Sequence, residues 1–289
     1  MRDTRPPSPA VIVGIDGSRS GTTAALWAVG EAVERDLPLR LVYAIDPPEE
    51  PATHEGRARA LAVAETAVRM ALVAVESTAK PVKIEVEILQ GRPKDVLLEA
   101  ARGAALICAG ATGFKTLTAG GQVGSTAAAL ATWAHCPVAI IRSYDPSPRT
   151  PRAIIAEVDP SADSDIVLHR AIDEAILRKA PLIVVAAWRS TVTSNHDVSA
   201  VAEQNRLLAV ELNRRLAETT RRHAGLVVQS AVVHGHLLEY LSCQARSAQL
   251  LVVGRRRTHG VAEIIGAAGF AALHEIDCSV LVCDSANSL

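Results

Sequence analysis

The sequence predicts two tandem α/β domains, each a five-stranded, parallel, doubly wound sheet with helices on both faces. Three observations carry this prediction: a length of 289 residues, an internal repeat, and short apolar runs that alternate with helical patterns. At roughly 100–200 residues per domain, the length favours two domains over one. The chain is 49% hydrophobic but only 3% aromatic, so its core must be aliphatic, as in parallel strands buried on both faces.

The internal repeat has an offset of 142–144 residues, shared by four landmarks in the same order. The paired landmarks are Asp16 and Asp159, Gly91 and Gly235, Gly110 and Gly254, and Cys136 and Cys278. We therefore expect two copies of one domain, at residues 10–143 and 153–289, after a loose tail at residues 1–9. A Pro-rich linker is expected over residues 144–152.

Apolar runs and helical spacing predict the same order of elements in both copies. In the first copy we expect strands at residues 11–15, 39–44, 84–88, 104–109 and 138–141, and helices near 25–33, 57–78, 93–101 and 124–134. In the second copy we expect strands at residues 153–158, 182–187, 226–233, 250–253 and 280–283, and helices at 165–178, 198–222, 237–246 and 262–275. Strands that alternate with helices of this length indicate parallel sheets.

Charge and cysteine content exclude several classes of protein. Lys and Arg number 30 and Asp and Glu 31, which excludes a globally basic nucleic-acid-binding protein, and the few aromatic residues disfavour stacking on bases. The cysteines are odd in number, have no C-x-x-C spacing and are expected to be buried thiols; they are Cys108, Cys136, Cys243, Cys278 and Cys283. No stretch approaches the length of a membrane span and no apolar leader is present, so we expect a cytoplasmic protein.

Polar and glycine-rich segments follow three strands of the first copy, at the edge where open α/β sheets bind ligands. The candidate site residues are Asp16, Gly17, Ser18, Ala44, Gly110, Gly113, Gly124, Ser125 and Thr126. Glycines and a helix N-terminus present N–H groups to phosphate, whereas a carboxylate suits ribose hydroxyls. The pattern predicts a phosphorylated nucleoside, with its ribose at Asp16. The alternative is that these glycines only form turns and that Ser125 is an N-cap.

The order of motifs in the first copy resembles the universal stress protein family. The motifs are the strand ending Val13-Gly14-Ile15-Asp16-Gly17-Ser18, the turn Gly91-Arg92-Pro93, the loop Gly110-x2-Gly113…Gly124-Ser125, and Cys136-Pro137-Val138. The resemblance covers nearly the whole chain as a tandem of the actinobacterial type. It implies Rossmann-like domains that pair through the strands at 138–141 and 280–283, and, in one branch of the family, ATP as the ligand, with or without Mg²⁺.

Carried over residue by residue, the resemblance places Asp16 at the ribose or adenine and the Ala44 backbone at the adenine edge. The phosphates would be held by Gly110, Gly113, Gly124, Ser125 and Thr126. Because aromatic residues are scarce, adenine is expected to lie against aliphatic side chains and backbone. The loop at residues 114–123 is one residue longer than in ATP-binding relatives; we expect its glycines to absorb the insertion, and the alternative is a spoiled phosphate site.

The second copy departs further from the motif and predicts a degenerate nucleotide site. Asp159 is kept, but Pro160 replaces Gly17, and Gly266-Ala267 replaces Gly124-Ser125. Arg257 lies near the place of Gly113, within the run Arg255-Arg256-Arg257. This run could bind phosphate or form a solvated face, and both interpretations stay open at this point.

The candidate residues favour a binding protein over an enzyme. The nine histidines show no metal-ligand spacing, and no pair of carboxylates or water-orienting group for fast phosphoryl transfer can be identified. We therefore predict an adenine-nucleotide-binding stress-response or regulatory protein with little or no ATP hydrolysis. The alternatives are a scaffold without nucleotide that acts through its domain interface, and a slow ATPase or nucleotidyl-transfer enzyme of the same fold. Pairing of whole chains into a homodimer is left open, as are the stress signal and the partner.

Overall fold

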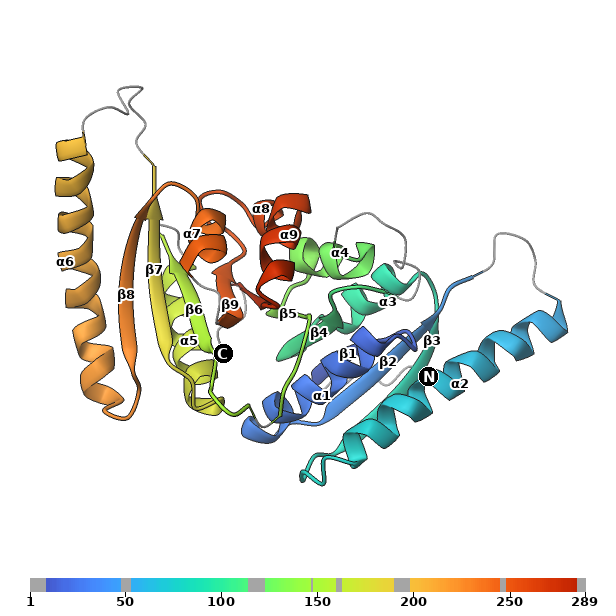
Figure 1. Cartoon of the computed structure of the whole chain (residues 1–289). Coiled ribbons are helices and arrows are strands. Elements are labelled where there is room, and N and C mark those ends of the chain that lie inside the picture. The colour runs from blue at the N-terminus through green and yellow to red at the C-terminus, as the bar shows by residue number, and fades with distance from the viewer. Residues whose placement is uncertain are drawn as a thin grey trace. The chain divides into compact units, whose positions relative to one another are not determined.

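The computed structural model consists of two compact units that divide at Pro146, within the expected linker (Figure 1). We call them unit 1 and unit 2. The structure describes residues 9–47, 53–113, 123–146, 148–159, 163–189, 198–244 and 248–284. The expectations for most of the N-terminal tail, for the loop at residues 114–122 and for Pro160 lie outside the described residues.

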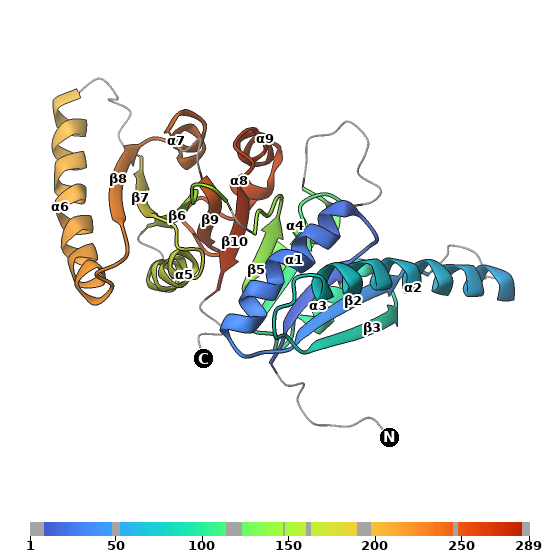
Figure 2. The same cartoon turned by 60° about the horizontal axis from the view of Figure 1, so that its bottom comes forward.

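Unit 1 is a five-stranded parallel sheet with the strand order β3-β2-β1-β4-β5. Its elements are β1 (Val11–Ile15), α1 (Arg19–Glu34), β2 (Leu39–Ile45), α2 (His54–Glu76), β3 (Ile84–Gln90), α3 (Pro93–Ala100), β4 (Leu106–Gly110), α4 (Ser125–Trp133) and β5 (Val138–Ile141). The order reverses between β1 and β4. Since parallel crossovers are right-handed, α1 and α2 cover one face of the sheet and α3 and α4 the other (Figure 2).

Unit 2 repeats this topology with the strand order β8-β7-β6-β9-β10. Its elements are β6 (Ala153–Val158), α5 (Ser164–Leu177), β7 (Leu182–Trp188), α6 (Val198–Arg222), β8 (Val228–His234), α7 (Leu237–Gln244), β9 (Ala248–Gly254), α8 (Ala262–Ile265), α9 (Ala267–Glu275) and β10 (Ser279–Cys283). The predicted fold class, a parallel doubly wound sheet flanked by helices, is thus confirmed.

Aliphatic central strands form the core of each unit. Every residue of β5, β6 and β10 is buried, and β1 and β4 are buried except at one glycine each, Gly14 and Gly110. Both glycines lie at the carboxyl ends of their strands. The strands therefore supply a fixed, apolar floor, and the segments that follow them reach the surface at one edge.

The single helix expected at residues 262–275 is wrong, because Gly266 divides it into α8 and α9. Gly266 adopts extended backbone, with φ −71° and ψ −179°, and serves as the N-cap of α9. A Cβ at this position would lie 2.7 Å from the carbonyl oxygen of Ala262. The apolar spacing continues through the break, so periodicity alone does not reveal it.

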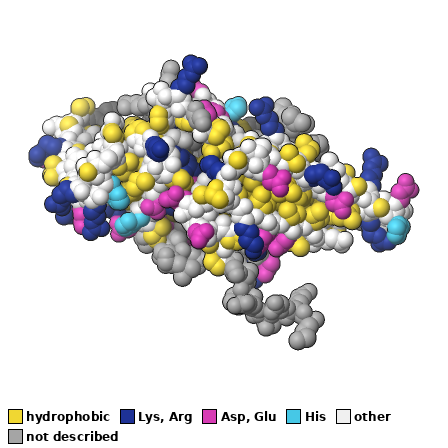
Figure 3. All heavy atoms as spheres, turned by 90° about the horizontal axis from the view of Figure 1, so that it is seen from below, with side chains coloured by type: hydrophobic (Ala, Val, Ile, Leu, Met, Phe, Trp, Pro, Cys, Tyr) yellow, Lys and Arg dark blue, Asp and Glu magenta, His cyan; other side chains and the backbone are white. Residues whose placement is uncertain are grey.

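None of the described helices combines the length and the hydropathy needed to cross a membrane. On the face shown in Figure 3, acidic and basic side chains are interspersed, in keeping with the near balance of charges in the sequence.

Candidate functional site

Unit 1 has a cleft of about 500 Å³ at the carboxyl ends of β1, β2 and β4. It lies at the point where the strand order reverses, as expected for this topology. All of the predicted site residues except Gly17 line it: Asp16, Ser18, Ala44, Gly110, Gly113, Gly124, Ser125 and Thr126. Gly17 lies outside the lining, and its φ of +81° serves the turn from β1 to α1.

The turn after β1 is held by two short hydrogen bonds. The backbone N–H of Ser18 donates to Oδ1 of Asp16 at 2.9 Å, and the N–H of Gly21 donates to the Ser18 hydroxyl at 3.0 Å. Ser18 is therefore the N-cap of α1. Because this turn is anchored on both sides, the exposed Asp16 carboxylate is held at the mouth of the cleft.

The start of α4 provides donors for an anion. Gly124 is the N-cap of this helix and makes no side-chain capping bond, so the alternative in which Ser125 is the cap is wrong. The first N–H groups of a helix lack intrahelical partners and carry the positive end of the helix dipole. Gly124, Ser125 and Thr126 line the cleft; the N–H of Gly124 donates to the Ala111 carbonyl at 2.9 Å, so the helix start offers the N–H groups that follow it.

Gly110 has a structural reason to be glycine. A Cβ there would lie 2.7 Å from the carbonyl carbon of Ser20, so a larger residue would push α1 away from β4. Gly254 at the end of β9 is in the same position, because its Cβ would lie 2.7 Å from that of Asp163. These two glycines allow the helix to pack against the sheet in both units.

Sequence reasoning left five polar residues of the cleft out of the predicted site. The missed residues are Tyr43, Asp46, Arg92, Lys94 and Thr112. Arg92 is the N-cap of α3, which also begins without a side-chain capping bond, and both cationic side chains are exposed. The Gly91-Arg92-Pro93 motif was the available signal, since it places these cations at a helix start beside the sheet edge.

Tyr43 adds an aromatic ring to the cleft, where the sequence led us to expect only aliphatic side chains and backbone around an adenine. It is a partly buried aromatic residue in the lining of the cleft. Burial, and next the negative charge of Asp16, raise the pKa of Tyr43 above its ordinary value. Its hydroxyl therefore stays neutral at physiological pH and lies within electrostatic reach of Asp16.

A buried ion pair lies in the corresponding region of unit 2. Glu157 stands at the position of Gly14, and Arg257 at that of Gly113, by the repeat offsets. Nε and Nη2 of Arg257 donate to the two carboxylate oxygens of Glu157, the latter bond measuring 2.6 Å. The two side chains are only 2% and 4% exposed. Burial opposes the charged form of Arg257, but its bonds to Glu157 and then Glu263 outweigh this and raise its pKa.

Both sequence-based interpretations of the arginine run need correction, because each arginine has an acidic partner inside unit 2. Arg255 pairs with Asp284 at 3.0 Å and Arg256 with Asp163 at 3.1 Å. Only Arg256 is exposed, at 57%. The run is thus neither an unpaired phosphate site nor a solvated face.

Asp159, the counterpart of Asp16, is also engaged within unit 2. Its Oδ2 accepts hydrogen bonds from the backbone N–H of Thr258 at 2.6 Å and from the Thr258 hydroxyl at 2.8 Å. The carboxylate that corresponds to Asp16 is thus tied to the loop after β9 in unit 2.

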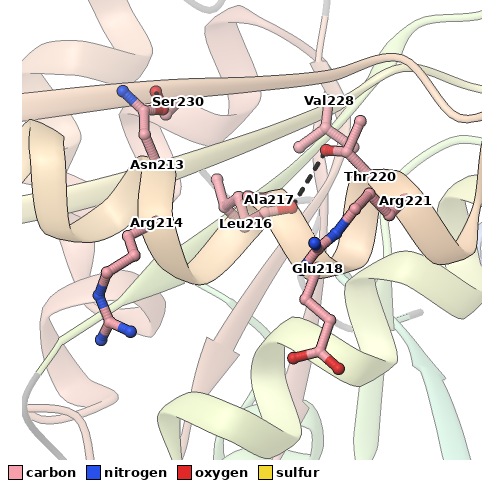
Figure 4. A pocket seen from close by; sticks show the side chains of 9 residues that line it. All are labelled: Asn213, Arg214, Leu216, Ala217, Glu218, Thr220, Arg221, Val228 and Ser230. Atoms are coloured by element: carbon pink, nitrogen blue, oxygen red, sulfur yellow. Dashed lines mark hydrogen bonds between the residues drawn. The ribbon is translucent and has the colours of Figure 1, made fainter.

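A second hollow, an open groove between α6 and β8, does not have the chemistry of a ligand site (Figure 4). Ser230 donates to Asn213 at 2.7 Å and Thr220 to the Leu216 carbonyl at 3.1 Å, so these groups are satisfied locally. Arg214 extends away from the strand and pairs with Glu211. The polar groups do not converge on a common point.

The described part of the chain contains no cluster of side chains suited to metal binding. No group of three His, Cys, Asp or Glu residues there could hold a metal ion. The five cysteines, all of them described, form no disulfide, and Cys243 is the exposed one. Burial is the main reason that the pKa of the Cys283 thiol is raised to about 12, so this thiol is unreactive in the folded unit.

Comparison with known proteins matches both units to the same protein family. The model of the universal stress protein family matches residues 9–142 and again residues 151–284. Universal stress protein Rv2028c of Mycobacterium tuberculosis is 45% identical over 278 residues, which cover 95% of each chain. Universal stress protein Rv3134c of the same organism is 42% identical over 290 residues, covering 99% of this chain and 100% of the other.

A solved structure shares the fold at low identity. The crystal structure of a universal stress protein from Archaeoglobus fulgidus has a TM-score of 0.66 at 15% identity and covers 95% of this chain and 96% of its own. The tandem arrangement of two α/β units is therefore common to both proteins.

Proposed function

Because the chain belongs to the universal stress protein family, we propose that unit 1 binds ATP or a related adenine nucleotide. We further propose that the protein acts in a stress response or its regulation, in the cytoplasm, with little or no hydrolysis. The free thiols fit a reducing compartment. Pairing of the two units through β5 and β10, and of whole chains, remains a prediction.

One observation carries this proposal: the residues predicted to contact the nucleoside and those predicted to contact the phosphates line the same cleft. Asp16 lies at the end of β1 and the Ala44 backbone at the end of β2, where ribose hydroxyls and an adenine edge would find acceptors and donors. The neutral ring of Tyr43 adds apolar surface and a hydroxyl beside them. These residues would bind the uncharged end of the ligand.

The groups suited to phosphates, N–H donors and cationic side chains, lie at the starts of two helices. Gly124, Ser125 and Thr126 present the N-terminus of α4, while Arg92 and Lys94 enter the cleft from the start of α3. Cations beside a helix N-terminus favour a ligand with several negative charges. We therefore propose a nucleoside polyphosphate rather than a nucleoside monophosphate, and Mg²⁺ would arrive bound to its phosphates.

Slow hydrolysis follows from the same lining. Its acidic residues, Asp16 and Asp46, follow β1 and β2, at the nucleoside end. No histidine or glutamate belongs to the described lining, so no side chain there is placed to activate water at a γ-phosphate. Binding without rapid turnover is the chemistry that these residues support.

The proposal is tested by analysing small molecules released from the denatured protein and by calorimetric titration with ATP. We expect one ATP per chain. Asp16→Ala and Gly124→Glu should abolish binding, because the first removes the ribose acceptor and the second places a carboxylate at the phosphate edge. Asp159→Ala in unit 2 is the matched control and should leave binding intact.

The alternatives predict different results in these assays. A chain that binds no ATP would leave the scaffold alternative. Rapid, Mg²⁺-dependent turnover with a second substrate would favour an enzyme of the same fold.

A further inference from the structure

Two glycines that leave the cleft of unit 1 open are replaced by opposite charges in unit 2. Gly14 pairs with Val42 in the sheet, and Glu157 pairs with Val185, so both stand at the same register of the sheet. Arg257 follows Gly254 by three residues, as Gly113 follows Gly110. Since Gly14 and Gly113 both line the cleft of unit 1, their replacements start from lining positions.

Four of the five N–H groups of the Arg257 guanidinium donate to acceptors inside unit 2. Besides its two bonds to Glu157, its Nη1 donates to Oε2 of Glu263 at 2.7 Å and to the carbonyl of Gly260 at 2.9 Å. Glu263 is only 17% exposed and Glu157 4%. The acceptors come from β6, from the loop after β9 and from α8, so they surround the cation.

The arginine cannot leave this position without a large penalty. Removing it would strand the buried Glu157 carboxylate in a poorly solvated place. Glu263 is also tied to His236, whose Nδ1 lies 3.0 Å from Oε1 of Glu263, and to the Arg189 guanidinium. The network holds the carboxylates in place around Arg257.

We propose that unit 2 contains a guanidinium-binding site, made by Glu157, Glu263 and the Gly260 carbonyl, which the chain fills with its own Arg257. This side chain occupies the place that a nucleotide would need, so each chain binds a single nucleotide, in unit 1. The count of nucleotides rests on the proposed function, whereas the filled guanidinium site does not.

The first test follows the Arg257 side chain by NMR in the full-length protein labelled with ¹⁵N-arginine. Its Nε–H signal is assigned from the variant Arg257→Lys or, if that variant does not fold, from cross-peaks to Glu157. We expect slow exchange of this proton with water, both in the free protein and at saturating ATP. The exposed Arg206 should exchange rapidly and serves as the internal reference.

The second test locates the nucleotide by photolabelling the wild-type chain with 8-azido-ATP and mapping the modified peptides. We expect label in residues of unit 1 only. Label in unit 2, or loss of the protected Arg257 signal when ATP is added, would overturn the inference, and so would rapid exchange in the free protein. If no ATP binds at all, the proposed function fails, while slow exchange of Arg257 still supports the self-filled site.

Discussion

The clefts of units 1 and 2 stand at the same reversal of strand order, yet one is open and the other is filled. In unit 1, Gly14 and Gly113 contribute no side chains, and a volume of about 500 Å³ remains. In unit 2, Glu157 and Arg257 meet across the equivalent place in a buried ion pair. The comparison shows that this fold survives the loss of the open cleft, because its strands and helices pack in the same way in both units.

A second contrast concerns which glycines are tied to the open cleft. Gly110 and Gly254 persist in both units, and each lies against the first helix of its unit. Their presence therefore reports helix packing rather than ligand binding. Gly14 and Gly113 are kept only where the cleft is open, so they follow the open cleft more closely than Gly110 does. A Cβ at Gly14 would also lie 2.7 Å from Cδ1 of Leu97, so packing against α3 bears on this position too.

The largest expected effect is the loss of stability of unit 2 when Arg257 is removed. Arg257→Ala should destabilise this unit by about 3–5 kcal/mol, because it leaves Glu157 buried without its partner. Urea denaturation followed by peptide-resolved hydrogen exchange would measure each unit separately. Removing both charges, in Glu157→Gln with Arg257→Met, should recover most of the lost stability.

The matched control for this comparison is Arg206→Ala. Arg206 pairs with Glu203 on the surface, where their side chains are 67% and 54% exposed, and its loss should not measurably change unfolding. Equal effects of the two arginine variants would contradict a buried pair in unit 2.

ATP should protect the buried thiols of unit 1 and leave those of unit 2 unchanged. At 100 times its dissociation constant, a ligand stabilises the folded state by about 2.7 kcal/mol, which corresponds to roughly 100-fold slower opening-dependent reaction. We expect this factor for alkylation of Cys108 and Cys136 and no change for Cys278 and Cys283, measured by mass spectrometry of digested samples. The exposed Cys243 reacts at once and calibrates the reagent.

Protection of all four buried thiols by ATP would contradict the expected difference between the two units. It would mean either that unit 2 also binds nucleotide or that the two units open together. The photolabelling experiment separates these two explanations.

The smallest expected effect concerns the charge at the start of α3. Lys94→Ala should weaken ATP binding about fivefold, or by ~1 kcal/mol, because the lysine is exposed and its attraction to phosphate is screened. AMP, with fewer charges, should lose less, and higher salt should narrow the difference. Lys83→Ala is the control, since Lys83 is 74% exposed, pairs with Glu85 and does not line the cleft.

The sequence was sufficient to predict the fold because the strands are short and aliphatic and the turns after them are polar. It was insufficient at residues 262–275, where apolar spacing runs through the extended backbone of Gly266. Most of the cleft was also predictable, since its residues lie at or just after the carboxyl ends of β1, β2 and β4. The α3 cations were missed because they lie at a helix start, whereas Tyr43 and Asp46 were missed although they lie within two residues of the predicted Ala44.

The ion pair of unit 2 could not be derived from local patterns. Glu157 and Arg257 are separated by 100 residues, and each taken alone suggests a surface charge. The missing signal lies in the alignment of the two copies, where two glycines of the first copy correspond to a glutamate and an arginine of the second. Such paired replacement indicates contact, but only the fold shows that the contact lies inside a cleft.

The Glu157–Arg257 pair also constrains how this protein can evolve. Changing Arg257 alone to glycine leaves the Glu157 carboxylate buried without its partner, which is strongly destabilising. Changing Glu157 alone removes two hydrogen bonds of the buried Arg257, which then keeps only Glu263 and the Gly260 carbonyl. Neither position can therefore change alone at low cost, so we expect Glu157 and Arg257 to be kept or replaced together. Gly14 and Gly113 of unit 1 carry no such mutual constraint.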